Sequence, residues 1–173
     1  MSSPKTERLL RLAIVLLTFT FVFVIANTLR ERITTVGDSA PDFSIKTENG
    51  QTISAASFGG KLLVLNFWAT WCPPCVEETP SLSRFAAQMA PSGVVVLAIS
   101  VDKDEKAYRD FIARHKPAFM TARDAQAKIN ADYGTFKYPE TYVINASGKV
   151  LRKFISDQAW DSERMVSDIK SLL

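Results

Sequence analysis

Cysteine and histidine are scarce in this chain, and their scarcity limits the chemistry that it can perform. The 173 residues include two cysteines, Cys72 and Cys75, and one histidine, His115. A structural zinc site needs four ligands, so these three residues fall short of one. Covalent haem attachment requires a histidine directly after the second cysteine, where Val76 stands. The sequence therefore predicts no metal site and no attached haem.

The chain also lacks a second long hydrophobic run and, over most of its length, any excess of basic residues. Hydrophobic residues make up 47% and charged residues 23%, which are the values of a globular protein rather than of a disordered or polytopic membrane protein. The formal net charge of +3 arises near the N-terminus, where Lys5, Arg8, Arg11 and Arg30 stand against Glu7. The rest of the chain is balanced, so we expect no nucleic-acid partner.

One long apolar run is present, near the N-terminus. It is uncharged from Leu12 to Leu29 and reaches the lower limit of length for crossing a membrane. Basic residues before the run favour a cytoplasmic N-terminus. We therefore predict a cytoplasmic segment at 1–11, a single-pass signal anchor in a bacterial cytoplasmic membrane at 12–29, a tether at 30–35, and one domain in the periplasm or extracytoplasmic space at 36–173.

A cleaved signal peptide is the alternative for this segment, with Val24-Ile25-Ala26 as a tolerable cleavage site. The run exceeds the usual length of the apolar part of a signal peptide, and no clear Ala-x-Ala follows it, which favours a retained anchor. A helix of a soluble core is not expected, because this segment is apolar on all faces and has no amphipathic pattern.

The pattern of the remaining chain predicts an α/β domain. Two apolar runs, Leu62–Phe67 and Gly93–Val101, are typical of strands buried on both faces of a sheet. A helix at Pro73–Met89 lies between them, which indicates a parallel pair with a right-handed crossover. We also expect a small hairpin, two further helices, two antiparallel strands and a terminal helix. These lie at Phe43–Ile45, Gln51–Ile53, Glu105–His115, Ala125–Asp132, Thr141–Ile144, Val150–Ile155 and Asp161–Leu172.

The two cysteines stand where the first apolar strand gives way to the helix. Such a pair suits a redox dithiol; a structural disulfide is the alternative, although so short a loop restricts the unfolded chain little. Free N–H groups and the helix dipole stabilise a thiolate at a helix N-terminus, so we predict Cys72 to be the attacking thiol. Cys75, a turn into the helix, is then placed to resolve the mixed disulfide. Pro73 and Pro74 suit a first turn, which has no use for their missing N–H groups.

The segment Phe67-Trp68-Ala69-x-Trp71-Cys72-x-x-Cys75 resembles the active-site signature of the thioredoxin superfamily. With Asn66 before it, Glu78 and Pro80 after it, and the leading Gly37-Asp38-x-Ala40-Pro41-Asp42-Phe43, the chain is similar to the membrane-anchored ResA/TlpA/CcmG-type branch over about 36–173. The resemblance implies a thioredoxin fold, a central mixed sheet flanked by helices, with an N-terminal β-hairpin. It also implies a protein disulfide reductase or thiol-disulfide oxidoreductase that needs no cofactor beyond its redox-active disulfide.

The same resemblance suggests the partners of such a protein. One is a disulfide-bonded protein substrate, such as apocytochrome c or another target of extracytoplasmic thiol reduction. The other is an integral membrane thiol carrier as electron donor. We expect a monomer that works as a reductant at the cytoplasmic membrane. The residues themselves give no reduction potential, so an oxidant and an isomerase remain open at this point.

The resemblance also suggests a substrate-binding surface beside the dithiol. Tyr138-Pro139 matches a loop that lies against the dithiol in the family, with Pro139 cis and Tyr138 offering backbone hydrogen bonds to an extended substrate. Trp71, Pro73 and Pro74 complete the predicted surface. A plain turn proline is the alternative for Pro139. Glu140 stands where the family often has threonine, which suggests a changed charge on the substrate side.

Glu78 is the predicted proton-transfer residue. The exchange reaction requires protons to move on and off the buried Cys75, and Glu78 lies one helical turn from it on the same face. Ordinary thioredoxins carry an aspartate beneath the dithiol, where this chain has Asn66, which cannot titrate. Glu77 is expected to point away. The alternative for Glu78 is a solvated acid near the start of a helix, where the dipole favours it.

A thiol peroxidase and a copper-delivery protein are the alternative functions on the same or a related fold. A peroxidase signature places a threonine three residues before the cysteine, whereas Thr70 precedes Cys72 by two. Copper delivery uses two thiolates and a histidine with Cys-x-x-x-Cys spacing, which this chain does not have. We expect Trp68 to be scaffold and assign no role to His115.

Overall fold

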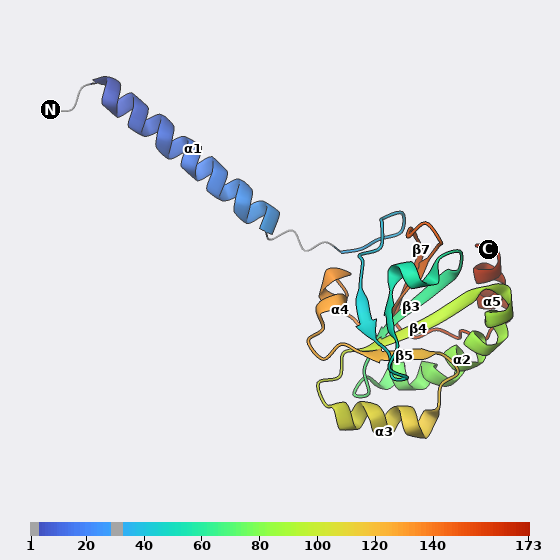
Figure 1. Cartoon of the computed structure of the whole chain (residues 1–173). Coiled ribbons are helices and arrows are strands. Elements are labelled where there is room, and N and C mark those ends of the chain that lie inside the picture. The colour runs from blue at the N-terminus through green and yellow to red at the C-terminus, as the bar shows by residue number, and fades with distance from the viewer. Residues whose placement is uncertain (1–3, 29–32) are drawn as a thin grey trace. The chain divides into compact units, whose positions relative to one another are not determined.

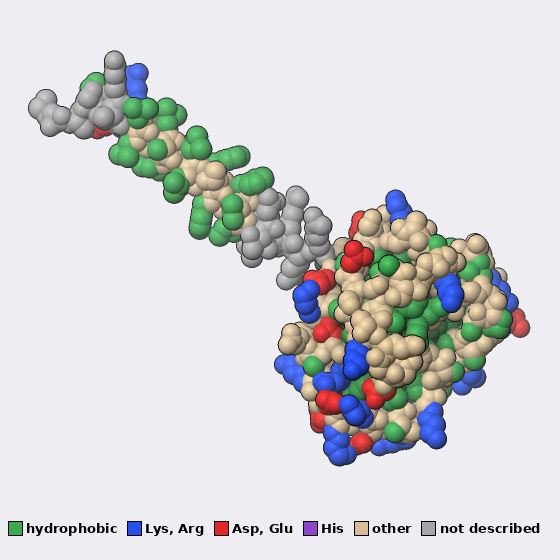
Figure 2. Space-filling view, in the orientation of Figure 1, with side chains coloured by type: hydrophobic (Ala, Val, Ile, Leu, Met, Phe, Trp, Pro, Cys, Tyr) green, Lys and Arg blue, Asp and Glu red, His purple; other side chains and the backbone are tan. Residues whose placement is uncertain are grey.

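The computed structural model describes residues 4–28 and 33–173, which fall into two compact units divided between Arg32 and Ile33. The first unit contains helix α1 (Pro4–Thr28). Its stretch Glu7–Ile25 is long and apolar enough to cross a membrane, and it is unburied by protein, although a signal sequence would have the same properties. Hydrophobic side chains cover the visible face of α1 in Figure 2. The last residue of the expected span, Leu29, and residues 30–32 of the expected tether lie outside the described residues.

The second unit is an α/β domain built on a mixed sheet (Figure 1). Its five strands lie in the order β5-β4-β3-β6-β7, and a separate two-stranded hairpin is formed by β1 and β2. β3 runs parallel to β4, as does β4 to β5, whereas β6 is antiparallel to both β3 and β7. The strands are β1 (Ser44–Lys46), β2 (Thr52–Ser54), β3 (Leu62–Trp68), β4 (Val94–Ser100), β5 (Met120–Arg123), β6 (Glu140–Ile144) and β7 (Val150–Ile155). The helices are α2 (Pro73–Met89), α3 (Glu105–His115), α4 (Lys128–Asp132) and α5 (Glu163–Lys170), with 3-10 turns η1 (Ala55–Phe58) and η2 (Ala90–Ser92).

The sheet is covered on both faces, which explains the unbroken apolar sequence of its central strand. All seven residues of β3 are buried. One face packs against the hairpin, η1 and α4, through side chains such as Ile53, Phe58 and Tyr133. The other face packs against α2 and α5, through side chains such as Phe85 and Ile169. Burial on both faces excludes a polar alternation in β3, so the strand reads as one hydrophobic run.

The domain is tied to its first residues by hydrogen bonds to their backbone. The Thr34 N–H donates to the Tyr133 carbonyl at 3.0 Å, and the Thr34 carbonyl accepts from Lys153 Nζ at 3.0 Å. Gly37 continues the segment by donating to the Val150 carbonyl at 2.8 Å. The compact unit thus includes residues that precede the expected domain start at Val36.

Most elements lie within two residues of the expected bounds, but two differ more from the expectation. β5 was not predicted, because its four residues, Met120–Arg123, form a short edge strand whose mixed sequence carries little hydrophobic signal. The helix expected at Ala125–Asp132 starts later, at Lys128, because Ala127 has a left-handed backbone (φ 52°). The Asp124 carboxylate accepts from the Ile129 N–H at 2.7 Å and so satisfies a backbone donor in the first turn of the helix.

Candidate active site

Cys72 and Cys75 are joined by a disulfide at the N-terminus of α2, with their Cα atoms 5.3 Å apart. Cys72 is the N-cap of the helix, and its Sγ accepts a hydrogen bond from the Cys75 N–H at 3.3 Å. The prolines Pro73 and Pro74 occupy the first turn, where a missing N–H costs nothing. Cys75 is 1% exposed and Cys72 5%, so Cys72 is the more accessible of the pair. This arrangement provides the Cys75 N–H and a helix dipole, which stabilise a thiolate on Cys72.

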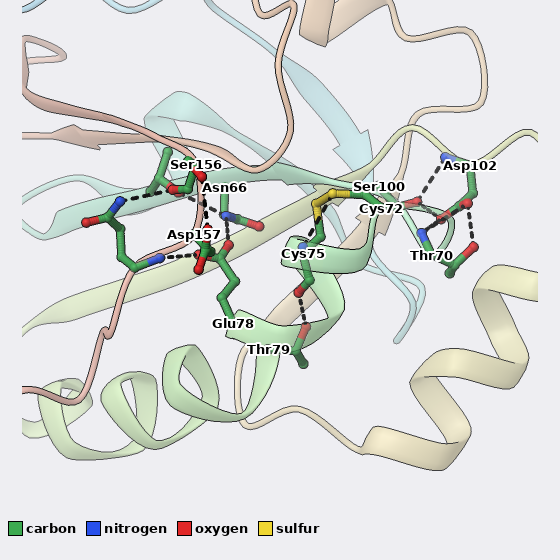
Figure 3. The surroundings of a disulfide bond; sticks show 12 residues. Asn66, Thr70, Cys72, Cys75, Glu78, Thr79, Ser100, Asp102, Ser156 and Asp157 are labelled. Carbon is green, nitrogen blue, oxygen red and sulfur yellow. Dashed lines mark hydrogen bonds between the residues drawn. A yellow bond between two sulfur atoms is a disulfide. The ribbon is translucent and has the colours of Figure 1, made fainter.

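The turn that leads into Cys72 is held by a buried carboxylate that the sequence analysis did not identify. Asp102 follows β4 and is 1% exposed. It accepts from the Thr70 N–H at 3.0 Å, from Thr70 Oγ1 at 2.7 Å and from Ser100 Oγ at 2.5 Å. Figure 3 shows Thr70 and Asp102 facing one another beside the disulfide. These bonds fix the backbone that carries Trp71 and Cys72.

The predicted substrate surface lies on the Tyr138–Pro139 loop and on Trp71. The Tyr138–Pro139 peptide bond is cis, and the Tyr138 side chain packs against the cluster that contains both cysteines. Trp71 is 63% exposed and meets the Tyr138 ring edge-on, with centroids 5.8 Å apart. A backbone hydrogen bond also holds the loop, since the Ser156 N–H donates to the Pro139 carbonyl at 2.9 Å. The structure thus brings an exposed aromatic side chain and the cis-proline loop to the edge of the dithiol.

Glu78 is buried on the same helix, with 4% of its surface exposed, which excludes the solvated acid that the sequence left open. Its Oε1 accepts from Asn66 Nδ2 at 2.9 Å, and its Oε2 accepts from the Gln158 N–H at 3.1 Å and from Trp160 Nε1 at 3.0 Å. Asn66 Nδ2 also donates to Thr141 Oγ1 at 2.9 Å. In Figure 3, Glu78 and Asn66 point toward one another near the disulfide. The asparagine therefore orients the acid that stands one turn from Cys75.

Burial raises the pKa of Glu78 from its ordinary value of 4.5 to about 7. Hydrogen bonds from Trp160, Gln158 and Asn66 favour the ionised form and oppose this increase, whereas the negative charge of Asp157 adds to it. A carboxyl with such a pKa exchanges its proton near neutral pH. It has the properties that a general acid or base needs at that pH.

Glu140 does not face the substrate side, and the expectation of a changed charge there was wrong. Its side chain is fully buried on the face of the sheet opposite Glu78, where its Oε1 pairs with Lys153 Nζ at 2.8 Å and accepts from the Tyr142 hydroxyl. The reason is strand alternation: Thr141, its neighbour, points toward Asn66, so Glu140 must point the other way. Glu140 belongs to the core behind the cis-proline loop.

The remaining residues that the sequence analysis singled out lie outside this arrangement. Glu77 is exposed, as expected, and Trp68 is buried against Phe111 with ring centroids 4.8 Å apart. His115 is exposed at the end of α3 and stacks on Phe111 at 4.1 Å. Among the described residues, no three His, Cys, Asp or Glu side chains form a group that could hold a metal ion. Trp160 and Gln158, which contact Glu78, were missed, because they are about 80 residues away along the chain.

A disulfide at a helix N-terminus, a cis-proline loop packed against it and this strand order define a thioredoxin-like thiol-disulfide oxidoreductase. A model of the Redoxin family matches residues 35–173, and the chain belongs to that family.

Known relatives agree with this assignment. The chain is 39% identical over 116 residues to the thioredoxin-like protein YneN of Bacillus subtilis, covering 66% of this chain and 68% of the relative. It is 32% identical over 123 residues to the thiol-disulfide oxidoreductase ResA of Bacillus cereus, covering 71% of each. Among solved structures, it resembles a Chlorobium tepidum protein assigned as thiol:disulfide interchange protein DsbE, with a TM-score of 0.73 and 28% identity over 79% of this chain and 96% of that one. The chain is therefore a ResA/TlpA/CcmG-type thioredoxin-like protein.

Proposed function

We propose that this chain is a membrane-anchored, extracytoplasmic reductant of protein disulfides, with Cys72 and Cys75 as its redox centre. The observation that supports it most directly is the combination of Cys72, the more exposed of the two cysteines, at the start of α2 and a buried Glu78 one turn beyond Cys75. The first residue is suited to attack a substrate, and the second to handle the proton of the resolving thiol.

The reaction proceeds in two exchanges. The Cys72 thiolate attacks one sulfur of the substrate disulfide, forming a mixed disulfide and releasing the first substrate thiolate, which takes up a proton from solvent. Glu78 accepts the proton of the Cys75 thiol, and the resulting thiolate attacks the Cys72 sulfur. The second substrate sulfur leaves as a thiolate that takes up a proton, Glu78 gives up the proton that it accepted, and the Cys72–Cys75 disulfide remains. The substrate gains two electrons, and no other cofactor is needed.

The substrate lies across Trp71 and the Tyr138–Pro139 loop. Trp71 supplies an exposed aromatic surface, and the backbone at Tyr138 pairs with an extended segment of the substrate in the manner of an added strand. Pro73 and Pro74 border the same surface. The partner is therefore a protein whose disulfide is held in an extended and accessible segment, of which disulfide-bonded apocytochrome c is the example that we propose.

Helix α1 retains the domain at the cytoplasmic membrane. Its apolar stretch, with basic residues before it, suits an N-terminus in the cytoplasm and a domain on the oxidising side. A reductant on that side needs electrons from within the cell, so we propose an integral membrane thiol carrier as the donor. The anchor keeps a monomeric domain near that carrier.

A trapping experiment tests the proposal. Cys75→Ser should arrest the reaction at the mixed disulfide, which would be captured from a disulfide-bonded Cys-x-x-Cys-His peptide and resolved on a non-reducing gel. Cys72→Ser should form no adduct. Failure of the Cys75→Ser variant to form an adduct with this peptide, while it does form one with an unrelated protein disulfide, would reject the apocytochrome substrate and leave the oxidoreductase activity intact.

A further inference from the structure

The segment from Ser156 to Trp160 contacts both the cis-proline loop and Glu78, although it belongs neither to that loop nor to α2. Its first residue donates a backbone hydrogen bond to the Pro139 carbonyl at 2.9 Å. Its third and fifth, Gln158 and Trp160, donate to Glu78 Oε2 with a backbone N–H at 3.1 Å and an indole N–H at 3.0 Å. Tied at Pro139, the segment is fixed where it delivers both donors to the acid.

Trp160 is the one side chain of this segment that enters the core. It is fully buried, and its ring packs on Phe85 of α2 and Phe154 of β7, each at a centroid distance of 5.5 Å. Packing on two sides fixes the direction of the indole N–H, so the bond to Glu78 requires no reorganisation when the carboxylate becomes charged. A hydrogen bond to an ionised group in such a buried setting is worth more than one between neutral groups.

We propose that Trp160 is a positioning residue, which holds the ionised Glu78 carboxylate in place and so keeps it available as a base for Cys75; this deepens the role proposed for Glu78 above.

Among the described residues, the other groups around Glu78 supply hydrogen bonds but no positive charge. β3 and β6 present neutral side chains, Asn66 and Thr141. The exposed Asp157 carries a negative charge that opposes ionisation, as burial does. On α2 itself, Cys75 is the titratable neighbour one turn away, and Glu77 points to solvent. Within the described residues, ionisation is thus supported by hydrogen-bond donors rather than by a cation, and the indole is the donor that a substitution can remove most simply.

The test is a titration of the Glu78 side chain in the oxidised full chain in detergent micelles, followed by the carboxyl carbon resonance of labelled glutamate. The disulfide removes both thiols from the titration. Trp160→Phe keeps a ring between Phe85 and Phe154 but removes the N–H, and it should raise the midpoint by roughly one to two pH units. Trp68→Phe is the matched control, because the Trp68 indole N–H is buried and has no hydrogen-bond partner among the described residues; it should leave the midpoint unchanged. An unchanged midpoint in Trp160→Phe would overturn the inference.

A second measurement needs no change to the tryptophan. The indole proton resonance of Trp160 should move with pH at the Glu78 midpoint, and this movement should vanish in Glu78→Gln. A resonance that is flat with pH would also reject the inference.

Reaction rates separate this inference from the proposed function. If Trp160→Phe raises the midpoint of Glu78 and also moves the pH profile for closure of the mixed disulfide by the same amount, both stand. If the midpoint moves and the profile does not, Trp160 positions Glu78 as inferred, and Glu78 is not the base for Cys75.

Discussion

Ionisation of Glu78 works against the folded state, which makes stability depend on pH in a direction that can be measured. The pKa of Glu78 is raised from 4.5 to about 7 by burial, so between these values the folded protein holds a proton that the unfolded chain releases. The folded state therefore loses stability as pH rises through this window, and the loss is complete above the folded pKa. Glutamine at this position has no charge to bury, so Glu78→Gln should remove this part of the pH dependence.

The size of the effect follows from the same two values. An increase from 4.5 to about 7, at about 1.36 kcal/mol for each pKa unit, corresponds to roughly 3 kcal/mol of unfolding free energy. Glu78→Gln should thus be more stable than the unaltered protein above about pH 8, by up to about 3 kcal/mol less the cost of a poorer match to Asn66. The advantage should shrink toward about pH 5, where the glutamate is protonated in the folded protein.

Urea denaturation of the oxidised domain, Ile33 to Leu173, from about pH 5 to about pH 9 measures this difference. Glu77→Gln is the control, because it removes the same charge from an exposed position next in sequence. Its difference from the unaltered protein should stay nearly constant over the range. A Glu78→Gln difference that is equally constant would refute the reasoning that Glu78 is buried with a raised pKa.

Three further changes test other parts of the structure. Lys153→Met should lower the unfolding free energy in urea denaturation by roughly 3 to 5 kcal/mol, because it leaves the fully buried Glu140 without its cation. Adding Glu140→Gln should restore most of this loss, because it removes the unpaired charge. Asp102→Ala should lower the unfolding free energy by roughly 3 kcal/mol. It should also accelerate hydrogen exchange at the Thr70 amide, which donates to Asp102 at 3.0 Å, and slow exchange in the variant would argue against this bond. Trp71→Ala should raise KM for a protein disulfide several-fold while stability changes by less than about 0.5 kcal/mol, since the side chain is 63% exposed; an unaltered KM would remove Trp71 from the substrate surface.

The sheet was largely readable from the sequence, because its central strands are buried on both faces and appear as apolar runs. Leu62–Phe67 was expected and β3 ends one residue later, at Trp68. The edge strand β5 has no such run, since an edge position with partly exposed ends tolerates residues such as Met120 and Arg123. Strand prediction from hydrophobicity thus succeeded for the buried central strands β3 and β4 and failed for β5.

The site could be predicted from the sequence where its residues are close together along the chain. The spacing between Cys75 and Glu78 places them on one face of a helix, and that relation needs no tertiary information. Trp160 reaches Glu78 through a loop after β7, whose course no local pattern describes. Glu140 was misplaced although strand alternation, applied from Asn66 and Thr141, would have assigned it to the opposite face.

The direction of electron flow is the central claim of the proposed function, and the reduction potential of the Cys72–Cys75 pair tests it most directly. The full chain in detergent micelles would be equilibrated with glutathione and dithiol buffers, and the fraction oxidised would be measured by thiol alkylation. A reductant of protein disulfides predicts a potential well below about −200 mV. A value near that of a strong oxidant, about −120 mV, would contradict it and make the protein a catalyst of disulfide formation.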